Sequence, residues 1–114
     1  MTDCLFCKIV KGEIPSESIY EDEQVLAFND INAQAPTHIL IIPKKHITTL
    51  NDLEDEDVEV AGRLMKVAAN LAKEKGFADA GYRVVMNCNQ DGGQAVYHIH
   101  LHLLAGRRLA LPLG

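Results

Sequence analysis

HIHLHLL, residues 98–104, places three histidines at alternate positions of an otherwise apolar run. A β-strand sends successive side chains to opposite faces, so His98, His100 and His102 are predicted to share one face of a strand over residues 95–104. The apolar residues between them then pack on a core. Three adjacent imidazolium charges would repel one another, so we expect this cluster to be at least partly neutral near pH 7. Neutral imidazole can act as a nucleophile, a general base or a metal ligand.

The histidine pattern alone leaves metal binding and nucleophilic catalysis by the central histidine both open. A solvated histidine face is the plainer alternative, but three of the chain's five histidines lie here. The preceding loop, Asp91-Gly92-Gly93-Gln94, places two glycines where backbone N–H groups can approach an anion closely. Asn87 and Gln94 add neutral polar donors. Beside the histidines, we favour a phosphate site over a plain glycine turn.

The composition predicts a single domain over residues 1–114. The chain has 114 residues, of which 47% are hydrophobic, and it can bury a core unaided. Its formal net charge is −5, with no basic stripe, which argues against nucleic acid as the main partner but allows a small nucleotide. No signal peptide or membrane-spanning run is evident, so we expect a cytoplasmic protein without a membrane partner.

The cysteines favour a metal or thiol role over structural disulfides, because their number, three, is odd and no secretion signal is seen. Cys4 and Cys7 form a C-x-x-C pair, which is half of a zinc site. His46 or one of the clustered histidines could supply the missing ligands. Two small buried thiols on the core face of a first helix explain the pair equally well.

Periodicity and turn residues predict an α+β fold of mainly strands, with one short and one long helix. Short loops between the strands favour an antiparallel sheet of about five strands with helices on one face. The short helix is expected over residues 4–11, a loop over 89–93, and strands over 19–21, 25–28, 38–42, 82–87 and 95–104.

The long helix is predicted to begin after an N-cap at Asn51 or Asp52. Gly76 is its expected C-terminal glycine. Its core-facing stripe is expected to consist of Val58, Ala61, Met65, Ala68 and Ala72, with Leu64 and Leu71 beside it.

Two further features have two interpretations each. His38 precedes an apolar strand, where a lone histidine is commonly a surface residue. Phe28 and Ile31 flank Asp30, and apolar walls with one carboxylate can bind a nucleoside through its ribose hydroxyls. A core phenylalanine and a turn aspartate explain the second feature just as well.

Together these blocks resemble the histidine triad (HIT) family. Residues 98–104 fit its His-φ-His-φ-His-φ-φ signature, where φ is apolar. Asp30-Ile31 with residues 35–38, and residues 42–46, are similar to the family's middle blocks. Residues 91–98 lead into the triad as in the Hint branch, with a tyrosine at Tyr97 where the Fhit branch typically has proline. The resemblance covers nearly the whole chain.

The resemblance implies a HIT-like protomer that forms a homodimer by joining two five-stranded sheets. It implies a purine nucleoside phosphoramidase acting on adenosine 5′-monophosphoramidate and related nucleotidyl amines. His100 would attack the α-phosphorus, expel an amine and form a covalent nucleotidyl-histidine, from which water releases AMP. His98 and His102 would orient and polarise the site, with His38 close to the triad.

The family's remaining site positions fall on matching residues of this sequence. Phosphate contacts would come from the segment that holds Asn87, Gly93, Gln94 and Ala95. The nucleoside pocket would be lined by Leu5, Phe6, Ile9, Ile14, Phe28, Asp30 and Ile31. HIT members with a C-x-x-C pair can hold zinc at the positions of Cys4, Cys7, His46 and His98. Such a zinc would be structural, with no open position, and catalysis would require no cofactor.

Two departures from the family pattern bear on specificity. Ala95 stands where the Hint branch often has serine, which removes one hydroxyl donor. Residues 106–114 resemble a Gly-Arg…Trp-Pro-Pro-Gly ending, with Leu111 for the tryptophan and Leu113 for the second proline. Three alternatives therefore stay open: a nucleotide-binding regulatory or scaffolding protein with vestigial hydrolysis, a dinucleoside polyphosphate hydrolase, which Tyr97 argues against, and a triad-bound catalytic metal.

Overall fold

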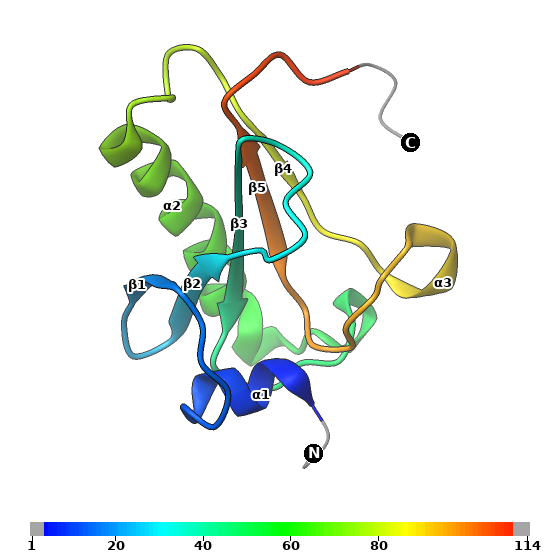
Figure 1. Ribbon diagram of the computed structural model, residues 1–114. Coiled ribbons are helices and arrows are strands. Elements are labelled where there is room, and N and C mark those ends of the chain that lie inside the picture. Colours follow the sequence, from blue (N-terminus) through cyan, green and yellow to red (C-terminus); the bar gives the residue numbers. More distant parts are fainter. Residues whose placement is uncertain (1–3, 111–114) are drawn as a thin grey trace.

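A five-stranded antiparallel sheet in the order β1-β2-β3-β5-β4 forms the centre of the computed structural model (Figure 1). This confirms the predicted α+β fold. The structure describes residues 4–110, so the predicted differences at Leu111 and Leu113 lie outside the described residues. The elements are α1 (Leu5–Val10), β1 (Ser18–Glu21), β2 (Val25–Asn29), β3 (Thr37–Pro43), the 3₁₀ turns η1 (Leu50–Asp52) and η2 (Asp55–Asp57), α2 (Val58–Lys75), β4 (Arg83–Val85), α3 (Asn89–Gly92) and β5 (Leu101–Ala105).

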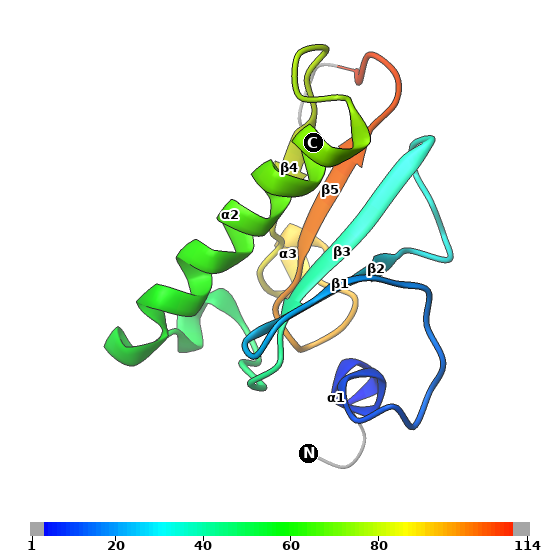
Figure 2. The same cartoon turned by 90° about the vertical axis from the view of Figure 1, so that its left-hand side faces the viewer.

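The sheet carries α2 along one face, while α1 lies at the other (Figure 2). Side chains alternate between these faces along each strand. Ile39 and Leu103 join the core beneath α2, whereas Leu40 packs with Phe28 and with Phe6 of α1. Both faces of β3 are covered, which explains its nearly continuous apolar sequence. The prediction that the helices share one face is therefore wrong.

Helix α2 ends as predicted, because Gly76 adopts the left-handed conformation, with φ of 85°, and its N–H closes the last turn. Its start differs from the prediction. Asn51 and Asp52 lie in a separate 3₁₀ turn, η1, where Thr49 and Asp52 form a capping box. A second 3₁₀ turn, η2, follows, in which the Glu54 N–H donates to Oδ2 of Asp57, and the α-helix begins directly after it at Val58.

The buried stripe of α2 is rotated from the predicted one. Ala68 and Ala72 are buried as expected, but Val58 is 69% exposed and Met65 is 53% exposed. The buried stripe consists of Val60, Leu64, Val67, Ala68, Leu71 and Ala72. Both sets of residues have helical spacing, so only docking against the sheet decides which one faces the core. Within residues 4–110, no helix is long and apolar enough to cross a membrane.

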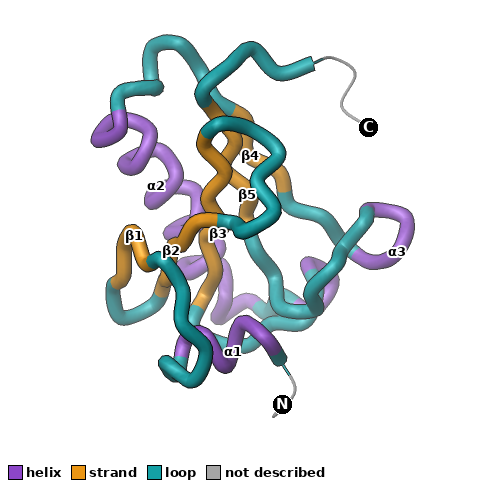
Figure 3. The backbone as a smooth tube through the Cα atoms, in the orientation of Figure 1, coloured by secondary structure: helices purple, strands orange, loops and turns teal. Residues whose placement is uncertain are grey.

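The predicted strand over residues 95–104 is wrong in its first half. β5 begins only at Leu101, and residues 96–98 form a bend (Figure 3). The N–H of Ile99 donates to the carbonyl of Ile47, 2.8 Å away, so this segment is held by the connection after β3 and not by the sheet ladder. The predicted loop over residues 89–93 also differs, because it contains the short helix α3, closed by Gly93 with φ of 80°.

The rotation of α2 can be tested with adjacent residues. Leu64→Ala should lower the free energy of unfolding by about 2–5 kcal/mol, because it leaves a cavity at a side chain that is 1% exposed. Met65→Ala, the matched control, should cost under about 1 kcal/mol. Urea denaturation at one fixed protein concentration measures both. An equal or larger loss for Met65→Ala would contradict the observed orientation.

Candidate active site

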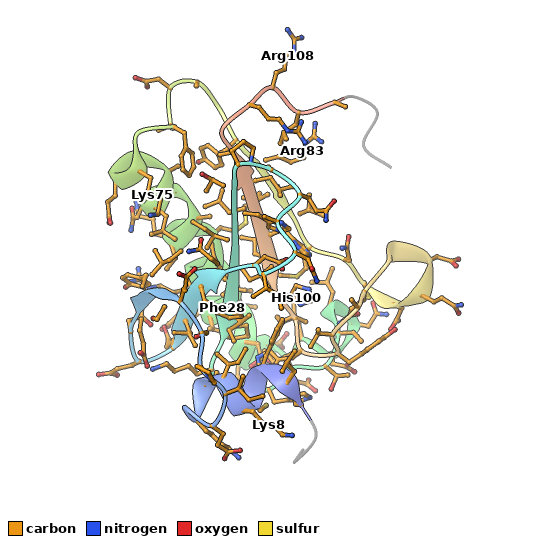
Figure 4. The ribbon with its side chains drawn as sticks, viewed as in Figure 1. Lys8, Phe28, Lys75, Arg83, His100 and Arg108 are labelled. Atoms are coloured by element: carbon orange, nitrogen blue, oxygen red, sulfur yellow. The ribbon has the colours of Figure 1, made fainter. Side chains whose placement is uncertain are left out.

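The hydrogen bonds of His100 define which of its nitrogens can react. Its Nδ1 donates to the carbonyl oxygen of His98 at 2.8 Å, and a carbonyl can only accept. Neutral His100 therefore carries its hydrogen on Nδ1 and a lone pair on Nε2. The ring is buried and packs edge-on against Phe6, with ring centroids 5.1 Å apart. Figure 4 shows His100 in the central part of the molecule, above α1. The local backbone thus prepares a nucleophilic nitrogen.

His102 and His38 form a hydrogen-bonded pair on the same face of the sheet as Leu40. His102 lies opposite Leu40 across the β3–β5 ladder, which makes it a diagonal neighbour of His38. Nε2 of His38 lies 2.9 Å from Nδ1 of His102 and 3.4 Å from Oδ2 of Asp30. Because Nδ1 of His38 accepts the Gln34 N–H at 3.0 Å, neutral His38 donates from Nε2. His102 then accepts at Nδ1 and carries its own hydrogen on Nε2.

The cluster of Asp30, His38 and His102 has the residue types of a metal site, with ligand atoms within 4.8 Å of one another. Its hydrogen bonds favour proton transfer instead. Nδ1 of His38 already accepts a main-chain N–H, so the one hydrogen of neutral His38 occupies Nε2, which leaves no lone pair there for an ion. In this tautomer, His38 therefore cannot be a ligand of a catalytic metal.

Lowered pKa values keep His98, His102 and His38 mainly in the neutral form at pH 7. Burial lowers the pKa of His98 to about 4. Burial, and then the neighbouring His100 and His38, lowers the pKa of His102 to about 4. Burial also lowers the pKa of His38, although the Asp30 carboxylate opposes this shift. Desolvation is thus the main reason that these three pKa values are low, and repulsion between the rings is a smaller one. His38, which could have been a surface residue, is 5% exposed.

A second cluster joins the C-x-x-C pair to the triad. Cys4, Cys7, His46 and His98 each offer one ligand atom, and these atoms all lie within 4.8 Å of one another. Sγ of Cys7 is 3.2 Å from Nδ1 of His46, and Sγ of Cys4 is 3.4 Å from Nδ1 of His98. Of the two interpretations of the cysteines, the structure favours a metal centre over an inert buried pair.

The outer nitrogens of both histidines in this cluster are held by the protein. Nε2 of His98 donates to the Pro43 carbonyl at 2.8 Å, so neutral His98 has its lone pair on Nδ1, facing the thiols. Nε2 of His46 lies 3.2 Å from Oγ1 of Thr48. Such outer-shell bonds orient metal-binding imidazoles in proteins. In the ion-free form, burial raises the pKa of the Cys7 thiol, and its hydrogen bond to Cys4 adds to this.

Among the predicted phosphate-contact residues, Gln94 has a different role from the one expected of its side chain. Its Nε2 donates to the carbonyls of Thr48, at 2.8 Å, and Val96, at 3.1 Å. Its Oε1 accepts the Asn89 N–H at 2.8 Å. The interpretation of this amide as a free phosphate donor is therefore wrong: it holds the loop in place. Gly93 and Ala95 are exposed, and Asn87 is half-buried.

The residues predicted to line a nucleoside pocket divide into a buried wall and exposed positions. Phe6 and Phe28 are buried, with ring centroids 5.6 Å apart, and Ile9 packs against the same cluster. Ile31, just after β2, is 96% exposed and presents apolar surface that residues 4–110 do not cover. Leu5 is exposed, and Ile14 and Asp30 are half-buried.

Several groups that position the site could not be found from the sequence. The carbonyl of Pro43 fixes His98, the N–H of Gln34 fixes His38, and the carbonyl of Thr48 holds Gln94. Every residue has these main-chain groups, so no residue type signals them.

The fold and the histidine arrangement together define a histidine triad protein. A family model described as HIT domain matches residues 11–109, and the chain belongs to the HIT family. The purine nucleoside phosphoramidase of Escherichia coli (strain K12) is 53% identical over 112 residues, which cover 98% of this chain and 91% of that protein. The 14 kDa zinc-binding protein of Zea mays is 55% identical over 112 residues, covering 96% of this chain and 87% of that protein.

Solved structures share the same fold. The crystal structure of a HIT family hydrolase from Legionella pneumophila Philadelphia 1 superposes with a TM-score of 0.96 at 55% identity, covering 98% of this chain and 100% of that chain. A histidine triad protein from Clostridium difficile superposes with a TM-score of 0.95 at 51% identity, covering 98% of this chain and 97% of that chain.

The low pKa of His102 predicts an acid-labile fold. Its folded pKa of about 4 lies below the ordinary value of about 6.5, so the unfolded chain takes up the proton first as the pH falls. His102 therefore contributes stability that is complete above about pH 6.5 and is lost towards pH 4. Between pH 7 and pH 5, this loss should be on the order of 1–2 kcal/mol. Urea denaturation of the wild type and His102→Gln at both pH values measures it. An equal pH-dependent loss in both proteins would contradict the assignment.

Proposed function

We propose that this chain is a purine nucleoside phosphoramidase, which hydrolyses the P–N bond of adenosine 5′-monophosphoramidate and related nucleotidyl amines. The observation that carries the proposal is the hydrogen bond from Nδ1 of His100 to the His98 carbonyl, which leaves Nε2 as the nucleophile. The activity of the E. coli relative, at 53% identity over 98% of this chain, supports the same reaction.

The reaction proceeds in two displacements on phosphorus. The lone pair on Nε2 of His100 attacks the α-phosphorus, the P–N bond breaks, and its electron pair leaves with the amine, which takes up a proton from the solvent. Water then attacks the phosphorus and returns a proton to the solvent, the bond to Nε2 breaks, and AMP leaves. His102 presents an N–H from Nε2, a donor for a phosphate oxygen or the leaving nitrogen. His38 and Asp30 hold His102 in that tautomer.

Binding of the nucleotide is assigned to the two ends of this site. The backbone around Gly93 and Ala95, with Asn87, receives the phosphate, because exposed N–H groups beside glycine suit an anion. The apolar wall formed by Phe6 and Phe28, with Ile31, holds the base, and the Asp30 carboxylate accepts from ribose hydroxyls. The apolar residues Leu5, Ile9 and Ile14 complete the pocket, and Gln94 contributes by holding the phosphate-binding loop in place.

The metal assigned to Cys4, Cys7, His46 and His98 is zinc. A tetrahedral zinc ion with Zn–S near 2.3 Å and Zn–N near 2.0 Å places sulfur and nitrogen about 3.5 Å apart. The observed distance from Sγ of Cys7 is 3.2 Å to His46 and 3.6 Å to His98. With all four protein ligands, a zinc ion would have no open position; it would hold α1 against the triad and would supply no reactive water. The zinc-binding protein of Zea mays, at 55% identity, supports this choice.

We also propose that the protein acts as a homodimer. β4 is an edge strand of the sheet and pairs only with β5 within the described chain. An edge strand offers unpaired backbone groups to a second copy, and pairing two copies of β4 would join two five-stranded sheets.

The nucleophile is tested by AMP release from adenosine 5′-monophosphoramidate. His100→Ala should reduce kcat by at least about 10³-fold, because no other group forms the covalent intermediate. AMP binding by calorimetry and the thermal midpoint serve as controls for folding and for the pocket. Equal turnover by His100→Ala would contradict the role of His100. A folded wild type that binds AMP but releases none would favour the nucleotide-binding regulatory alternative.

The metal assignment is tested by elemental analysis of protein produced with zinc in the medium. The wild type should contain about one zinc per chain, and Cys7→Ser should lose it and unfold at a lower temperature, because one thiolate ligand is missing. Cys88→Ser is the matched control, since Cys88 is a free cysteine outside the ligand cluster. Zinc-free wild-type protein, or equal loss in Cys88→Ser, would refute the site.

A further inference from the structure

We propose that Arg107 is a positioning residue for the triad: it anchors Gln34, and Gln34 fixes the tautomer through which His38 serves His102. The proposal deepens the proposed function and rests on it where catalysis is concerned. The C-terminal segment after β5 thereby becomes a structural support of the active site within one protomer.

The guanidinium of Arg107 connects two segments that are far apart in the sequence. Its Nη2 donates to the carbonyl of Gln34 at 3.0 Å, and its Nη1 donates to the carbonyl of Arg108 at 3.2 Å. The first bond reaches the loop between β2 and β3, and the second fixes the turn in which Arg107 itself lies. A charged donor makes a stronger hydrogen bond than a neutral one, and the planar fork holds both carbonyls together.

Gly106 brings the two segments into contact. It has a φ of 102°, and a Cβ built on it would lie 2.7 Å from Cβ of Pro36. The contact follows from the ladder, because Thr37 at the start of β3 pairs with Ala105 at the end of β5. A side chain at Gly106 would push the loop and the C-terminal segment apart.

Gln34 is the centre of the β2–β3 loop. Its main-chain N–H donates to Nδ1 of His38 at 3.0 Å, and its side-chain Nε2 donates to the carbonyl of Asn32 at 3.0 Å. The N–H of Asn32 in turn donates to Oδ1 of Asp30 at 2.8 Å. Arg107 thus holds Gln34, which bonds directly to His38 and, through Asn32, is connected to Asp30.

The tautomer of His38 depends on this hydrogen bond between Arg107 and Gln34. While the Gln34 N–H occupies Nδ1, the hydrogen of His38 must sit on Nε2, where it is shared with His102 and Asp30. Without that donor, the hydrogen can move to Nδ1, and two lone pairs would then face each other over the 2.9 Å between His38 and His102. The pair would have to rotate or exchange tautomers, and His102 would lose the Nε2–H that serves as a donor in the proposed mechanism.

Arg108 provides a matched control. It is adjacent, carries the same charge and is exposed, but its side chain makes no hydrogen bond or ion pair with residues 4–110. Figure 4 shows it extending away from the body of the molecule. If only the positive charge of this segment mattered, removal of either arginine would have the same effect. Anchoring of Gln34, in contrast, would be lost only with Arg107.

The test compares Arg107→Ala with Arg108→Ala by ¹⁵N NMR of the histidine side chains at pH 7. In the wild type and Arg108→Ala, His38 should be wholly in the Nε2–H tautomer. In Arg107→Ala, a mixture of tautomers should appear, and kcat for AMP release should fall about five- to thirtyfold, which corresponds to about 1–2 kcal/mol. Arg107→Lys, which retains one donor, should restore part of both.

An unchanged His38 tautomer in Arg107→Ala, or the same change in Arg108→Ala, would overturn the proposal. A fall in kcat with an unchanged tautomer would also overturn it, since a purely structural role lowers activity without that signature. The NMR comparison needs no substrate, so it tests the anchoring even if the wild type hydrolyses no phosphoramidate, the outcome that would refute the proposed function instead.

Discussion

The position of His98 is the constraint on which the rest of the site depends. Its ring is fully buried, and its Nε2–H is held by the carbonyl of Pro43 at the end of β3. This bond turns Nδ1 towards the thiols of Cys4 and Cys7 on α1. The main-chain carbonyl of the same residue holds His100. One residue therefore connects the sheet, the N-terminal helix and the proposed nucleophile, and a buried imidazole with partners at both ring nitrogens favours one geometry.

Main-chain groups set the tautomers of His98, His100 and His38. The carbonyls of His98 and Pro43 accept hydrogens from His100 and His98, and the N–H of Gln34 donates one to His38. A backbone carbonyl never donates and a backbone N–H never accepts, so each imidazole is left with one possible neutral form. Desolvation then lowers the pKa of His98 and of His38, which favours their neutral forms at pH 7. The chemistry of this site thus depends on backbone placement as much as on the histidines themselves.

The two faces of the sheet have separate roles. The face beneath α2 carries the apolar core, with Ile39, Ile41 and Leu103 buried completely. The opposite face carries His38, Leu40 and His102, with Phe6 and Phe28 beside them. Strand β5 supplies both faces at once, because His102 lies between Leu101 and Leu103. Packing of the apolar face can therefore support the polar arrangement of imidazoles on the other.

The sequence by itself determined the α+β class and the end of α2 at Gly76, because local conformational preferences and hydrophobic patterning carry both. Its resemblance to the HIT family added the expectation that Cys4, Cys7, His46 and His98 form one ligand set and that His100 is the nucleophile. Only the tertiary structure decided that Leu64, and not Met65, faces the core, that β5 starts at Leu101, and that Gln94 holds its own loop. Each of these depends on which surface or main-chain group a distant segment presents. Hydrophobic spacing and residue type do not specify that partner.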